Sequence, residues 1–281
     1  MKITVKKLII STLLLFTSPL FCNKKTQENF WKALETNDGP VLEAAINAGA
    51  NVNKPGGTSG MEPLLYAITF SSPEIVKLLL TSNKVDLNKL LDGGNTPLIT
   101  AVKHNKPTVV KLLLADKRVD PNKKNKIGDT PFMEAITTNN PTLFFMFLDN
   151  DDVNINTIGS NGETPLTYFL SKKDGSFFAI IQRLLDYEAD PNKANKKGMT
   201  PLAIAIEKNQ PKIVELLLQY QADPYKESKG DTALEIADEQ GNKEIVALIE
   251  NTIRAKQEGT SQILKRRQEF GPDVSRLIEK Y

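Results

Sequence analysis

A motif of eight residues recurs six times along the chain, and its regular spacing constrains the fold more than any other feature of the sequence. Successive copies lie 34, 34, 34, 36 and 32 residues apart, and a glycine stands two residues before each one. The copies begin at Glu62, Thr96, Thr130, Thr164, Thr200 and Thr232, and the glycines are Gly60, Gly94, Gly128, Gly162, Gly198 and Gly230. This period predicts short units that must stack to bury their apolar faces.

Each copy carries the local chemistry of a helix start. A threonine side chain can accept a hydrogen bond from the free N–H groups of the first turn, and the proline that usually follows suits the first helical position. The preceding glycine allows a tight turn with positive φ. A small residue then leaves room for a neighbouring helix to approach closely, at Ala67, Ala101, Ala135, Ala205 and Ala237.

A second helix follows about two turns later. An Asn, Ser, Lys or Gln precedes another proline, as in "NNPTLFF", and Pro73, Pro107, Pro141 and Pro211 open this helix. The segment "IVKLLL" gives it a continuous apolar face, and polar segments such as "EADPN" lead on to the next glycine. The sequence therefore predicts a repeated unit of helix, turn, helix and extended finger.

These units resemble the ankyrin repeat. The resemblance rests on the Thr-Pro-Leu start, the small residue five positions later, the "IVKLLL" helix and the segments "GANVN" and "QADPY", and it covers roughly residues 28–255. It implies an all-α solenoid of helix-turn-helix units with β-hairpin-like fingers. The family's motif histidine is absent, so its inter-repeat hydrogen bonds are not carried over. Its places hold Leu65, Ile99, Met133, Thr167, Ala203 and Glu235.

The repeat pattern also divides the chain. We expect a signal at 1–22, an N-terminal capping ankyrin repeat at 28–61, ankyrin repeats at 62–95, 96–129, 130–163, 164–199 and 200–231, a C-terminal capping repeat at 232–255, and a helical extension at 256–281.

Two regions depart from the regular unit. In the repeat at 164–199, Phe169 replaces the small residue and extra residues within "SKKDGSFF" predict a local bulge. In the extension we expect a loop around Gly259-Thr260, a charged helix to Phe270 and a short helix after Gly271-Pro272. Its apolar residues either cover the end of the stack or belong to a mobile tail. They are Ile263, Leu264, Phe270, Val274, Leu277 and Ile278.

The first residues have the layout of a secretory signal peptide, because three lysines precede an apolar run from Leu8 to Phe21. A buried N-terminal helix or strand is the alternative. Cys22, the only cysteine, ends this run and resembles the lipobox cysteine of bacterial lipoproteins, although Phe21 and Pro19 depart from that pattern. Lipidation of Cys22 and ordinary cleavage nearby both stay open. We expect an exported protein, either periplasmic or membrane-anchored.

The sequence offers little catalytic chemistry. Without the three N-terminal lysines, 33 basic residues face 34 acidic ones, whereas a general nucleic-acid binder carries a basic excess. His104, the only histidine, has no second histidine or cysteine for a metal site and no evident nucleophile to activate. The acidic run "DNDDVNINTIGSNGE" lacks calcium-loop spacing. We therefore predict no cofactor, no metal, no nucleic-acid partner and no enzymatic activity.

The resemblance implies a protein partner, bound by finger tips and by the exposed ends of the first helices. Place by place, it indicates Phe70, Lys103, His104, Thr137, Thr138, Glu207 and Lys208 on helix ends, and Ile127, Ile158 and Met199 on fingers. The three apolar finger residues have the alternative of packing against neighbouring fingers. Stacking should also align Lys124, Lys126, Lys196, Lys197, Lys226 and Lys229. That basic ridge is either a solvated face or a docking edge for an acidic protein or anionic lipid.

Two functional hypotheses follow. The first is a non-catalytic scaffold of the bacterial cell envelope that binds another protein through finger tips and concave helix ends. The second is an exported inhibitor, immunity protein or host-directed effector that blocks one cognate enzyme. In both, the membrane is contacted only through an N-terminal lipid anchor, if one is present.

Overall fold

The computed structural model describes residues 24–91, 93–138, 140–172 and 177–270, with the backbone alone for 260–270. The signal at 1–22, with Cys22, and the segment 271–281 lie outside the described residues. The chain divides into two compact units, Met1–Val153 and Asn154–Tyr281, called unit 1 and unit 2 below, and each is described by itself.

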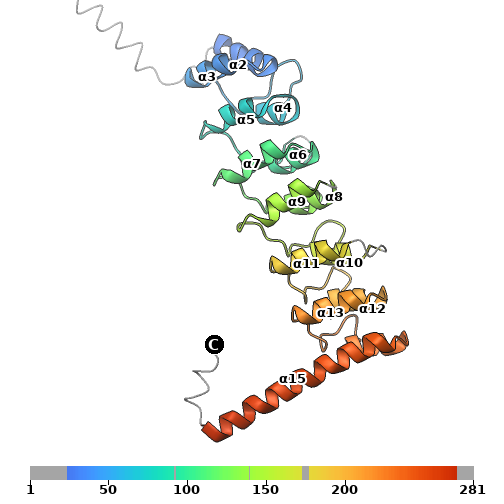
Figure 1. Ribbon diagram of the computed structural model, residues 1–281. Coiled ribbons are helices and arrows are strands. Elements are labelled where there is room, and N and C mark those ends of the chain that lie inside the picture. Colours follow the sequence, from blue (N-terminus) through green and yellow to red (C-terminus); the bar gives the residue numbers. More distant parts are fainter. Residues whose placement is uncertain (1–23, 92, 139, 173–176, 271–281) are drawn as a thin grey trace, which may run out of the picture. The chain divides into compact units, whose positions relative to one another are not determined.

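The described residues of unit 1 form four helix pairs (Figure 1). They are α2 (Lys24–Thr36) with α3 (Gly39–Asn47), α4 (Pro63–Phe70) with α5 (Pro73–Leu80), α6 (Pro97–Lys103) with α7 (Pro107–Ala115), and α8 (Pro131–Thr137) with α9 (Pro141–Leu148). The first helices α2, α4, α6 and α8 contact one another in succession, and so do the second helices α3, α5, α7 and α9. The unit therefore has two layers of helices with the apolar core between them.

Unit 2 repeats this arrangement, with three helix pairs in the part that the structure describes (Figure 1). They are α10 (Pro165–Leu170) with α11 (Phe178–Asp186), α12 (Pro201–Glu207) with α13 (Pro211–Gln219), and α14 (Ala233–Glu239) with α15 (Lys243–Phe270). The first helices α10, α12 and α14 again lie in one layer, and α13 contacts α15 in the other. The predicted all-α fold of stacked helix pairs is confirmed.

The helix starts form as the repeated motif predicts. The Thr96 hydroxyl accepts a hydrogen bond from the backbone N–H of Ile99 at 3.2 Å, and the four later threonines cap their helices in the same way. Glu62 makes no such bond. All six glycines before the motif have positive φ, from 68° to 107°. The small residues of the first helices, such as Ala101, are completely buried, which allows the close helix contacts.

The fingers are linked to one another by asparagine side chains. The Asn88 amide donates to the Arg118 carbonyl oxygen at 2.7 Å and accepts from the backbone N–H of Asp120 at 2.7 Å, so it joins two successive fingers. Asn156 and Asn192 make the same pair of bonds in unit 2. These bonds link successive repeats in a chain whose repeats lack the motif histidine. Each bond exchanges a contact with water for one with the next finger.

The repeat at 164–199 has a longer connection between its two helices than the repeat at 96–129. Residues 173–176 of the expected bulge lie outside the described residues, but residues 171–177 separate α10 from α11, whereas 104–106 separate α6 from α7. Phe169 is buried, and its ring centroid lies 5.3 Å from that of Phe177. The larger side chain is therefore accommodated by the longer connection.

The prediction of a loop around Gly259-Thr260 is wrong, because α15 runs without interruption from Lys243 to Phe270. A glycine inside a helix costs only about 1 kcal/mol relative to alanine, and the flanking Ala, Lys, Gln, Glu, Leu and Arg residues favour the helix. The proposed boundary between residues 255 and 256 thus falls inside one helix. No helix in the described part of the chain is both long and apolar enough to cross a membrane.

Candidate protein-binding surface

The ends of three first helices form a row of exposed side chains in unit 1. Phe70, the last residue of α4, is 60% exposed, and Lys103, His104 and Thr137 at the ends of α6 and α8 are also exposed. Thr138 is half-buried. Successive ends lie close together, because the Lys106 ammonium donates to the Thr69 carbonyl oxygen at 2.9 Å and the Asn140 amide donates to the Asn105 side-chain oxygen. We call them the helix-end row. In unit 2, Glu207 and Lys208 at the end of α12 are exposed.

An aromatic cluster supports the exposed Phe70. The Phe70 ring centroid lies 5.1 Å from that of Tyr66, which in turn lies 6.0 Å from that of Trp31 in an edge-to-face arrangement. Trp31 is buried, whereas Tyr66 is half-buried. Such contacts hold rings in fixed positions. The spacing of Tyr66 and Phe70 by four residues was the available sequence signal for this cluster, and Trp31 was not predicted to belong to it.

The finger between α3 and α4, called the first finger, packs directly on Trp31. A Cβ atom placed on Gly56 would lie 2.5 Å from the indole Nε1 atom, and one on Gly57 would lie 2.6 Å from the indole Cε3 atom. The same finger is fixed to α2 because the Glu35 carboxylate accepts hydrogen bonds from the Thr58 backbone N–H at 2.6 Å and hydroxyl at 2.8 Å. The glycines of this finger are therefore required for a close approach.

One carboxylate on the first-helix layer is held in an unfavourable environment. Partial burial raises the pKa of Glu134 above its usual value, Lys103 partly opposes this effect, and Asp129 adds to it. The Lys103 Nζ atom lies 3.8 Å from a Glu134 carboxylate oxygen. An ion pair that is this exposed on the lysine side contributes little stability. The pair instead places both signs of charge beside His104 in the helix-end row.

The apolar finger residues occupy three different environments. Ile127 is 64% exposed, Ile158 is half-buried, and Met199 is buried. Of the two alternatives for Met199, burial contradicts exposure to a partner and agrees with packing within the protein. Ile127 precedes its finger glycine, Gly128, whereas Met199 follows its own, Gly198, so the two residues occupy different places in the repeat. The sequence analysis did not identify Leu90, which is 40% exposed on the finger that precedes the one carrying Ile127.

The predicted ridge lysines are all exposed. Lys124 and Lys126 lie in unit 1, and Lys196, Lys197, Lys226 and Lys229 lie on two successive fingers of unit 2. The backbone N–H of Lys126 donates to the Gly94 carbonyl oxygen at 2.8 Å, and that of Lys196 donates to the Gly162 carbonyl oxygen at 2.7 Å. Neighbouring fingers are thus connected through these lysines.

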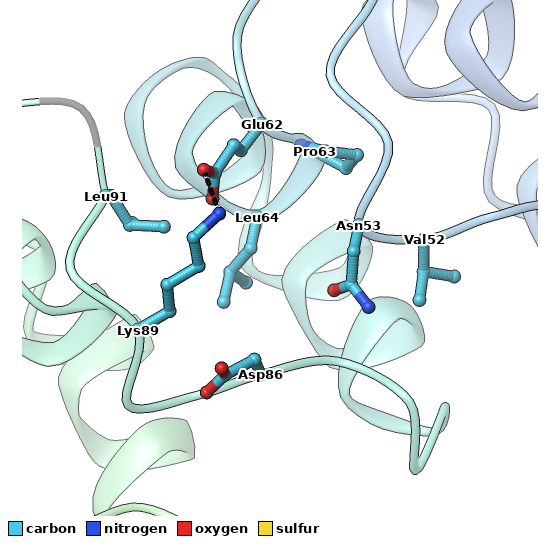
Figure 2. Close-up of a pocket in the computed structure, with 8 residues that line it drawn as sticks. All are labelled: Val52, Asn53, Glu62, Pro63, Leu64, Asp86, Lys89 and Leu91. Atoms are coloured by element: carbon cyan, nitrogen blue, oxygen red, sulfur yellow. Dashed lines mark hydrogen bonds and ion pairs between the residues drawn. The ribbon is translucent and has the colours of Figure 1, made fainter.

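A small cavity lies between the first two fingers of unit 1 (Figure 2). Its volume is about 200 Å³, below the range of roughly 300–1,000 Å³ common for small-molecule sites. The Lys89 ammonium donates to the Glu62 carboxylate at 2.7 Å across it. This contact occupies Glu62, which the sequence places at a helix-capping position. No group of three or more potential metal ligands occurs in the described part of the chain.

Stacked helix pairs with projecting fingers and an exposed row of first-helix ends define an α-solenoid repeat protein. The family model for ankyrin repeats, in three copies, matches residues 30–125 and 169–258, which is more than half of the chain. The chain therefore belongs to the ankyrin-repeat family. Proteins of this family are generally non-catalytic, and their fold mediates protein–protein interactions.

Solved structures share this fold. The ankyrin repeat domain of Bcl-3, a member of the IkappaB protein family, matches with a TM-score of 0.63 and 21% identity, over 79% of this chain and 97% of that one. EF0377, an ankyrin repeat protein, matches with a TM-score of 0.53 and 27% identity, over 66% and 95%.

A third similar structure comes from an enzyme complex. It contains the predatory endopeptidase Bd0816 from Bdellovibrio bacteriovorus in complex with the immunity protein Bd3460. A chain of that structure matches with a TM-score of 0.50 and 26% identity, over 67% of this chain and 96% of that one. No curated protein sequence gives a significant match.

Proposed function

We propose that this protein is a non-catalytic scaffold that binds another protein through the helix-end row and the finger tips. The proposal rests on the exposure of Phe70. Its large aromatic side chain is 60% exposed and packs against the Tyr66 ring. Aromatic side chains in fixed positions dominate the binding energy of many interfaces. Lys103, His104 and Glu134, on the next two first helices α6 and α8, supply polar contacts that set orientation.

The helix-end row extends over three neighbouring repeats of unit 1. Standard protein interfaces bury about 800 Å² on each partner, and we expect three or four neighbouring repeats to supply that area. Because the helices carrying the row contact one another, little ordering is required when the partner binds.

Site-specific photo-crosslinking in the native cell tests this proposal. A photoreactive amino acid at position 104 should capture one discrete protein, identifiable by mass spectrometry. The matched control is position 111, an exposed lysine on the second helix α7. Phe70→Ala should reduce the captured fraction about ten-fold, as expected for loss of an aromatic anchor. Equal capture at both positions, or capture unaffected by Phe70→Ala, would refute the proposed surface.

We also propose that the protein is exported and acts in the bacterial cell envelope, either in the periplasm or attached by a lipid at Cys22. The lysines before the apolar run at Leu8 to Phe21 support this proposal. Fractionation and intact mass of the mature protein test it. Cys22→Ser should abolish partitioning into detergent if the cysteine is lipidated, and an unprocessed N-terminus in the cytosolic fraction would contradict export.

A second candidate function is that the chain blocks one cognate enzyme. The similarity to a chain of the endopeptidase–immunity protein complex supports it. A scaffold and an inhibitor use the same surface but differ in outcome, because an inhibitor must abolish turnover of its partner. The test is to assay any peptidase encoded beside this gene with and without the purified protein. Inhibition at a one-to-one ratio, lost in Phe70→Ala, would favour this function over the scaffold.

A further inference from the structure

Two finger lysines are held in place by the preceding finger. A Cβ atom built on Gly94 would lie 2.7 Å from the Lys126 Cβ and 3.3 Å from its Cδ, so the lysine stem lies across the glycine. Lys196 lies across Gly162 in the same way, with a corresponding distance of 3.0 Å to its Cβ. The backbone hydrogen bonds of both lysines to these glycines fix the register.

This packing prepares the two lysines for binding. The aliphatic stem of such a lysine is already restricted in its rotamers when the protein folds. Binding of a partner to the ammonium group therefore costs less conformational entropy. Both side chains are nevertheless exposed, because the stem packs while the charged end stays in solvent. Lys126 and Lys196 therefore differ from lysines that extend freely from a helix surface.

Each of these lysines has an exposed apolar or aromatic side chain on its own or a neighbouring finger. Ile127 follows Lys126, and Leu90 lies on the finger that Lys126 contacts. In unit 2, Tyr225 is 51% exposed on the finger after Lys196. Exposed apolar and charged side chains on the same or the next finger can supply the apolar core and the polar rim of one interface.

We propose that these finger tips bind an acidic segment of the partner protein, a deepening that rests on the function proposed above. Each unit offers its own site. In unit 1, carboxylates of the segment pair with Lys126 and its apolar side chains contact Ile127. In unit 2, Lys196 and Tyr225 have the corresponding roles. Charge complementarity selects this partner. An anionic bilayer presents the same charge to these lysines, and the experiment below distinguishes it from an acidic segment.

The test uses the full chain and a fluorescent peptide of glutamates with leucine at every fourth position. Fluorescence anisotropy gives its affinity at about 50 mM and about 200 mM NaCl, since screening separates surface charge contacts from apolar ones. Lys126→Gln and Lys196→Gln should each weaken binding about three- to five-fold. Lys111→Gln, which removes an exposed lysine from α7, should leave it unchanged.

Equal effects of Lys111→Gln and the two finger variants would overturn the inference. Binding of the wild-type chain to phosphatidylglycerol vesicles but not to the peptide would also overturn it and assign the finger tips to a lipid surface. The crosslinking experiment at position 104 does not use the finger lysines. Successful crosslinking with a failed peptide titration therefore rejects the acidic segment alone, whereas failure of the crosslinking rejects the proposed function.

Discussion

The asparagine links between fingers predict how strongly neighbouring repeats are coupled. Asn88→Ala removes two hydrogen bonds of 2.7 Å, one to the Arg118 carbonyl oxygen and one from the Asp120 N–H. A typical intramolecular hydrogen bond contributes about 0.5–1.5 kcal/mol, and these two lie at an exposed site, so we expect the free energy of unfolding to fall by about 1–2 kcal/mol. The loss acts between repeats rather than within one.

Urea denaturation followed by circular dichroism measures this loss. The matched control is Asn150→Ala, because the Asn150 side chain accepts a bond of 3.0 Å from the nearby Asp152 N–H and so supports only a local turn. In a linear repeat protein, weaker coupling between neighbours also broadens the transition. The reasoning is refuted if Asn88→Ala costs no more than Asn150→Ala and leaves the width of the transition unchanged.

Three further predictions concern single residues. Gly56→Ala should lower the free energy of unfolding by about 1–3 kcal/mol because its methyl group meets the Trp31 ring, and loss of stability without a change in tryptophan fluorescence would contradict this cause. Gly259→Ala should raise helicity and stability by up to about 1 kcal/mol, whereas a loop there would show no gain in circular dichroism. The folded-state pKa of Glu134 lies above 4.5, so its ionisation lowers stability as pH rises from about 4.5 through the folded pKa. Glu134→Gln should therefore gain stability over wild type at pH 7 but not at pH 4, and an equal difference at both pH values in urea titrations would refute that sign.

Features fixed by local chemistry were predictable from the sequence. The caps at residues such as Thr96 and the positive φ of Gly94 depend on backbone conformation within a few residues, and both appear where the motif places them. The burial of Ala101 follows from its position on a helix face that must contact a neighbouring helix. Repetition strengthens such predictions, because the same residue pattern recurs in each copy of the motif.

Features that depend on contacts between fingers were not predictable in the same way. Ile127 and Met199 are both apolar finger residues, yet the first is exposed and the second is buried, because they stand on opposite sides of their glycines. The two hydrogen bonds of the Asn88 side chain could not be predicted without knowing which backbone groups of the next finger lie opposite it. The course of α15 through Gly259 shows that the surrounding helix formers outweigh one glycine.

Hydrogen-exchange mass spectrometry of the complex with the crosslinked partner tests the central claim most directly, because it reports which amides the partner covers. The helix-end row should gain protection on binding, in peptides that contain Phe70, His104 and Thr137, while the second helices α5 and α7 should exchange as in the unbound protein. Protection confined to α5 and α7 would contradict the account, because the partner would then bind the opposite layer.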